Sequence, residues 1–154
     1  MYEVNRTQVE EGTVNTEFEA ITVQEAQRIS DYAESVVAAF KSDAPTFGYN
    51  PPSVRLLSDS ITSGRAGYTE EQRIRVANLF GAFCGHAMLV CHKGVPGRWI
   101  KSKGDLGIVF TRGKQQWVVF PINRVFKHID SGPEYSTYDF FMAVHELLKP
   151  KPSA

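Results

Sequence analysis

Apolar residues recur at helical spacing through the first half of the chain. From about Val23 to Phe40 they fall three or four positions apart, with charged and amide side chains on the opposite face. This pattern predicts an amphipathic helix with one buried stripe. Thr22 and Glu25 form the capping-box pattern that begins such a helix. A shorter helix is expected to begin after Asn50. Its apolar stripe consists of Val54, Leu57 and Ile61.

The most apolar stretch predicts a third helix, from about Glu70 to Cys91. Thr69 and Gln72 repeat the capping-box pattern at its start. Its second half is apolar nearly all round, so we expect it to be the central, buried helix. Gly81 and Gly85 lie four positions apart on one face, where they would let another element approach closely.

The apolar period changes after Gly94. Three short β-rich runs, separated by turn residues, predict an antiparallel meander over about 98–101, 106–111 and 115–120. Two further helices are expected, from Ile122 to near Gly132 and from Ser136 to Leu148. The predicted fold class is α+β, with three N-terminal helices, a three-stranded antiparallel meander and two C-terminal helices packed on one face of the sheet.

The predicted division of the chain is a single α+β domain over residues 22–149 with short extensions. Residues 1–21 form either an acidic arm or an edge strand, because apolar and polar residues alternate from Val14 to Ala20. Residues 150–154 form a tail. The first residues lack the pattern of a secretory signal, and no apolar run approaches the length of a membrane span. We therefore expect a cytoplasmic protein.

The composition fits a folded domain. Of the 154 residues, 42% are hydrophobic and 12% aromatic, which is enough apolar material for a core and excludes a disordered chain. Seventeen basic residues balance seventeen acidic ones, so binding driven by the net charge of the whole chain is also excluded.

The charges are nevertheless unevenly distributed. Residues 93–127 contain eight basic residues and one acidic residue, whereas residues 1–20 contain five acidic residues and one basic residue. Aromatic residues are interleaved with the basic ones of the meander. Aromatic rings beside phosphate-binding cations hold single-stranded nucleic acids, so nucleic-acid binding by the basic meander 93–127 is our second hypothesis. The interleaved aromatic residues are Trp99, Phe110, Trp117 and Phe120.

The same pattern has a structural interpretation. In a half-buried sheet the apolar residues pack on the helices, and the Lys and Arg side chains stay in solvent on the outer face. The dense apolar runs 106–110 and 117–120 favour this interpretation over an exposed stacking platform.

Cys84 and Cys91, with the neighbouring His86 and His92, raise the question of a zinc site. Helical residues seven positions apart lie about 10 Å apart along the axis. This is too far for both sulfurs to bind one zinc ion at about 2.3 Å, or to form a disulfide. We therefore expect no metal and two thiols that act as small apolar side chains. A thiol- or His-dependent enzyme built around Cys84, His86 and His128 is the third hypothesis, although the chain has no nucleophile elbow or phosphate-binding loop.

A protein-binding surface is our first hypothesis. Arg and Tyr are enriched among the residues that dominate the binding energy of protein interfaces. The chain offers them, with several Lys, on the predicted strands, at their turns and in the loop before the last helix. The candidate partner-binding residues are Arg98, Lys101, Lys103, Arg112, Lys114, Tyr135 and Tyr138. No residue is assigned a catalytic role.

Four features of residues 78–148 recur together in a known family. They are a Gly-containing buried helix, a Trp that opens a three-strand meander, a Pro that closes it, and a short basic helix that ends near a Gly. In this chain they correspond to Gly81 and Gly85, Trp99, Pro121, Val125-Phe126-Lys127, and Gly132. The stretch thereby resembles a small bacterial domain family of unknown function.

Small cytosolic domains of this build are similar to immunity proteins, which bind and block antibacterial toxins. The resemblance implies a non-catalytic binder of another protein, in this case a toxin domain, that needs no cofactor.

Overall fold

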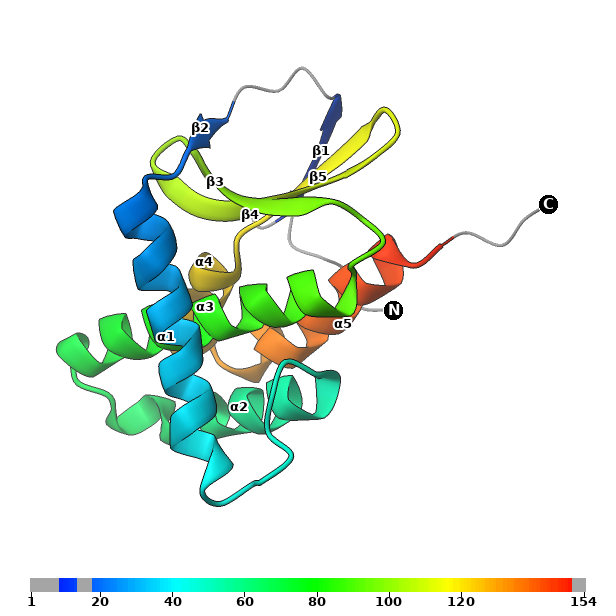
Figure 1. Ribbon diagram of the computed structural model, residues 1–154. Helices are drawn as coiled ribbons and strands as arrows, with labels where there is room; N and C mark the ends of the chain where they lie inside the picture. The colour runs from blue at the N-terminus through cyan, green and yellow to red at the C-terminus, as the bar shows by residue number, and fades with distance from the viewer. Residues whose placement is uncertain (1–8, 14–17, 151–154) are drawn as a thin grey trace.

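Five antiparallel strands form one sheet, and the helices lie on one side of it (Figure 1). The computed structural model describes residues 9–13 and 18–150. The order of the strands across the sheet is β1-β5-β4-β3-β2. Their bounds are β1 Val9–Thr13, β2 Glu19–Ala20, β3 Gly97–Ser102, β4 Asp105–Arg112 and β5 Gln115–Val119.

The helices follow β2 and then β5 along the chain. Three precede the meander of β3, β4 and β5, and two follow it. Their bounds are α1 Val23–Lys41, α2 Pro51–Gly64, α3 Glu70–Cys91, α4 Pro121–Ser131 and α5 Thr137–Leu148, with 3₁₀ turns at Arg65–Gly67 (η1) and Pro133–Tyr135 (η2).

The α+β class predicted from the sequence is confirmed, but the predicted sheet is too small. Two strands flank the predicted meander: β1 pairs with β5, and β2 pairs with β3. Both strands precede α1 and lie within residues 1–21, for which the sequence left an acidic arm or an edge strand open. β2 is only two residues long, so its place beside β3 depends on tertiary packing rather than on strand propensity alone. The predicted alternation over 14–20 falls partly outside the described residues.

The central position of α3 is confirmed. It packs between α1 and α4, and its glycines allow two of the close contacts around it. A Cβ atom at Gly81 would lie 2.5 Å from the Cα atom of Ile122 in α4. A Cβ atom at Gly85 would lie 2.3 Å from the Trp99 ring of β3. The helix and its neighbours on either side therefore touch at positions where only glycine fits.

By length and hydropathy alone, α3 resembles a membrane span, the single helix in the described part of the chain that does so. The expectation that no helix of this chain spans a membrane stays a prediction. Both long flanks of α3 are nevertheless occupied by α1 and α4, which is the environment of a core helix.

The sheet has apolar residues on both faces. Ile108 and Phe110 of β4 pack toward the helices as part of the main core. On the opposite face, Ile100, Val109 and Val118 form a second buried cluster with Phe120, and Phe18 packs against it. The expectation that Lys and Arg would fill this outer face is therefore wrong, because the strands are apolar at successive positions rather than at alternate ones.

Candidate functional site

The structure does not gather the predicted basic residues on one surface. The Lys101 ammonium of β3 lies 2.6 Å from the Glu25 carboxylate of α1. Hydrogen bonds from Lys101 and from the Thr22 backbone lower the pKa of Glu25 to about 2. Arg112, at the end of β4, donates to the Leu148 carbonyl of α5 and lies over the Trp117 ring. Lys101 and Arg112 thus connect the sheet to the helices.

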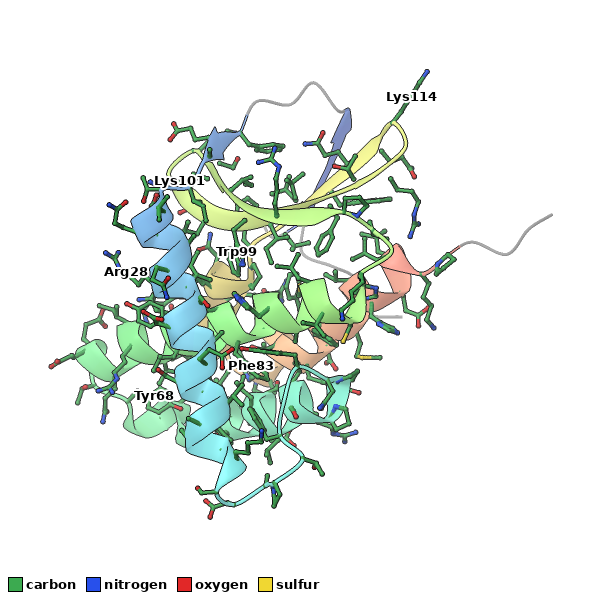
Figure 2. The ribbon with its side chains drawn as sticks, in the orientation of Figure 1. Arg28, Tyr68, Phe83, Trp99, Lys101 and Lys114 are labelled. Atoms are coloured by element: carbon green, nitrogen blue, oxygen red, sulfur yellow. The ribbon has the colours of Figure 1, made fainter. Side chains whose placement is uncertain are left out.

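The remaining basic candidates are exposed and far apart. Arg98 alternates with the inward-facing Trp99 and so belongs to the outer face of β3. Lys103 and Lys114 occupy the turns at opposite ends of β4, roughly 25 Å apart by the rise of a strand. Figure 2 shows Lys114 at the tip of its turn, well away from Lys101 beside α1.

Tyr135 and Tyr138 do lie close together along the chain, where η2 leads into α5. Both side chains are half-buried. The Lys127 ammonium lies 4.8 Å from the centroid of the Tyr135 ring, and the Arg55 guanidinium lies 5.5 Å from the centroid of the Tyr138 ring. A cation of the same chain therefore already lies over one face of each ring.

Cys84 lacks the access that a nucleophile needs. Its side chain is fully buried in the main core, and burial raises the pKa of its thiol to about 12. Because the thiolate is the reactive form, the proposed thiol-dependent site has no working nucleophile at neutral pH. Cys91 is half-buried, and burial raises its pKa as well.

His128 is held by hydrogen bonds from two other helices. The Thr137 backbone N–H of α5 donates to Nδ1 of His128 at 3.2 Å, so Nδ1 carries a lone pair. The proton of the neutral ring is then on Nε2, which donates to Oγ1 of Thr62 in α2 at 2.8 Å. Burial, Arg65 and Arg124 lower the pKa of His128 to about 4. This histidine therefore joins α2, α4 and α5 as a neutral structural group.

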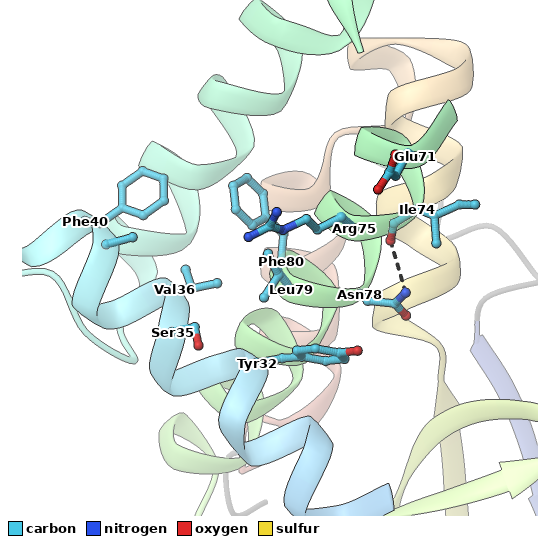
Figure 3. Close-up of a pocket in the computed structure, with 11 residues that line it drawn as sticks. Tyr32, Ser35, Val36, Phe40, Glu71, Ile74, Arg75, Asn78, Leu79 and Phe80 are labelled. Carbon is cyan, nitrogen blue, oxygen red and sulfur yellow. Dashed lines mark hydrogen bonds between the residues drawn. The ribbon is translucent and has the colours of Figure 1, made fainter. Parts of the chain in front are cut away.

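A different feature has the character of a binding site: an open groove of about 600 Å³ between α1 and α3 (Figure 3). We call it the α1–α3 groove. The second half of α1 forms one wall, and the first half of α3 forms the other. Phe40 and Phe80 meet edge to face, with ring centroids 5.9 Å apart. The lining residues are Tyr32, Ser35, Val36, Ala39 and Phe40 from α1, and Glu71, Ile74, Arg75, Asn78, Leu79 and Phe80 from α3.

The groove combines an exposed apolar surface with a few polar groups. Ile74 is 44% exposed, so the groove includes apolar surface that solvent reaches. Asn78 donates its amide N–H to the Ile74 carbonyl at 3.1 Å (Figure 3). Within residues 9–13 and 18–150, neither Glu71 nor Arg75 takes part in an ion pair. A concave, mostly apolar site of this volume with a few polar groups is typical of a site that receives another molecule.

Sequence analysis missed this groove. Val36, Phe40, Leu79 and Phe80 appear in the sequence as ordinary apolar positions of two amphipathic helices. The available signal is Ile74, the one apolar residue within 70–75 at the start of α3.

The described residues contain no cluster of three or more potential metal ligands. Comparison with models of protein families, with curated proteins and with solved structures finds no match to this chain.

Proposed function

We propose that this protein is a non-catalytic binding module that receives an apolar segment of another protein in the α1–α3 groove. The observation that carries the proposal is the exposure of Ile74 inside a groove of about 600 Å³. Removing apolar surface from water stabilises a complex by roughly 25 cal/mol per Å². Burial of the groove's apolar surface would therefore favour binding of a partner, whereas the dispersed cations of the sheet offer no such surface.

We further propose that the partner is a toxin domain and that binding neutralises it in the cytoplasm. The support is the resemblance of residues 78–148 to small immunity proteins. The exposed basic residues Arg98, Lys103 and Lys114, and the two tyrosines, remain predicted partner-binding residues, although they do not share one surface.

The first test compares two single variants of α3. Ile74→Glu places a charge inside the groove, whereas Val90→Glu places the same charge outside it. The two wild-type side chains are 44% and 42% exposed, so the variants should have similar stability. Each tagged protein is used to capture partners from a lysate of the source cell at high salt, and the captured proteins are identified by mass spectrometry.

We expect one protein to be retained by the wild type and by Val90→Glu, and to be lost from Ile74→Glu. Its own toxic activity should fall when the wild-type chain is added. A partner retained equally by both variants would contradict binding in the groove. A partner whose activity is unchanged by saturating wild-type chain would contradict the neutralising role alone.

A further inference from the structure

The walls of the α1–α3 groove are both helices. Backbone N–H groups within a helix are bonded to carbonyls of the same helix. An extended peptide binds by adding its backbone to the open edge of a sheet, and these walls offer no such edge. A helix brings its own backbone hydrogen bonds and needs only side-chain contacts, so it is the conformation that suits this groove.

The length of the groove limits the size of that helix. The lining residues of α1 extend from Tyr32 to Phe40, and those of α3 extend from Glu71 to Phe80. At about 1.5 Å per residue, each wall is roughly 12–14 Å long. Two turns of a helix fit this length, with apolar anchors at positions i, i+3 or i+4, and i+7.

The charged residues that line the groove favour one direction of the bound helix relative to α3. The charged lining residues, Glu71 and Arg75, are both on α3. They lie four positions apart, which places them on one side of that helix. A helix that runs antiparallel to α3 passes Arg75 first and Glu71 one turn later. It would pair with both if it carried an acidic residue followed four positions later by a basic one.

The antiparallel direction is favoured for two reasons. A Glu four positions before a Lys stabilises a helix more than the reverse order does. Antiparallel helices also place opposite ends of their dipoles beside each other.

We infer that the occupant of the α1–α3 groove is an amphipathic helix of the partner protein that runs antiparallel to α3. It carries an apolar stripe and a Glu/Asp–Lys/Arg pair at positions i and i+4. The inference rests on the proposed function and specifies the chemistry of the partner segment.

The test uses two synthetic peptides of equal composition and about 15 residues, the length at which isolated helices begin to be stable. Both carry the same Leu stripe. One has Glu at i and Lys at i+4, and the other has the reverse order. Binding to the full-length protein is followed by NMR through the Ile74 methyl signals. The same titrations are repeated with a charge-swapped double variant, Glu71→Arg with Arg75→Glu.

We expect the Glu-first peptide to bind the wild type about two- to tenfold more tightly, the range expected for exposed ion pairs. The charge-swapped variant should prefer the Lys-first peptide. Because the intrinsic helicity of each peptide is the same in both titrations, the reversal isolates the contacts with Glu71 and Arg75.

Other outcomes would overturn the inference. Equal binding of both peptides at the Ile74 methyl would contradict the orientation, while the groove would remain a binding site. If neither peptide shifts the Ile74 signals, the inference that a helix occupies the groove is wrong. The capture of partners by the wild type, Ile74→Glu and Val90→Glu still tests the proposed function independently. Concentration-dependent dimers that Ile74→Glu abolishes would identify a second copy of this chain as the occupant.

Discussion

Gly85 is the point at which α3 meets the sheet. The space that a side chain would fill there is taken by the Trp99 ring of β3, 2.3 Å from the position of an added Cβ atom. No other residue type fits without displacing this ring, because packed interiors accommodate even a single methyl group only by shifting side chains.

We expect Gly85→Ala to lower the free energy of unfolding by about 1–3 kcal/mol, the usual effect of overpacking a core. The better helix propensity of Ala offsets up to about 1 kcal/mol of this loss. Urea denaturation followed by Trp fluorescence measures the difference. Gly94→Ala is the matched control, because nothing lies within 4 Å of its added Cβ atom. Equal stability of both variants would show that Trp99 is not tightly held.

Local chemistry explains which helices the sequence predicts well. Both capping boxes are present: Thr22 and Glu25 bond reciprocally at 2.9 and 3.0 Å, and Thr69 and Gln72 at 2.9 and 3.1 Å. Each involves residues three positions apart, so a short stretch of sequence contains all the necessary information. The strands β1 and β2 differ, because their partners lie in a distant part of the chain.

Three helices are joined at His128, and this junction should respond to pH. The ordinary pKa of a histidine is near 6.5, and in the folded protein that of His128 is lowered to about 4. Between these values the unfolded chain binds a proton that the folded chain does not. The contribution of His128 to the free energy of unfolding is therefore fully present above pH 6.5 and is lost as the pH decreases toward 4. His92, whose pKa burial lowers to about 4, acts in the same direction.

Replacing His128 by Gln should make the stability less sensitive to acid. Between pH 7 and pH 5 we expect the wild type to lose about 2 kcal/mol more than His128→Gln. The measurement is urea denaturation at both pH values. For each protein, the free energy of unfolding at pH 5 is subtracted from that at pH 7. This difference does not include the pH-independent loss of stability that the substitution itself causes. Parallel losses in the two proteins would mean that His128 titrates normally.

At the scale of the whole molecule, the candidate site was hidden from sequence analysis because it depends on how two helices meet. The sequence identifies Val36, Phe40 and Phe80 as apolar. It does not reveal that α1 and α3 leave an open space beside these residues. Similarly, the sequence shows eight basic residues within 93–127, but not that the fold distributes them over different faces and ends of the sheet, the end of α3 and α4.

This dispersal predicts weak binding to nucleic acids. Lys103 and Lys114 are too far apart to follow one short stretch of backbone together. We expect the logarithm of the affinity for a single-stranded oligonucleotide to fall with the logarithm of the salt concentration with a slope below about 2 in magnitude. Fluorescence anisotropy at several salt concentrations measures this slope. A slope of about 4 or more would restore the nucleic-acid hypothesis.

The position of β1 has a consequence for how the protein is made. Residues 9–13 pair with residues 115–119, so β1 is translated about a hundred codons before its partner β5. A ribosome adds about 5–20 residues per second. For about 5–20 s, therefore, the nascent chain carries a strand that has nothing to pair with. The edge of the sheet that contains β1 therefore forms only after β5 has been made.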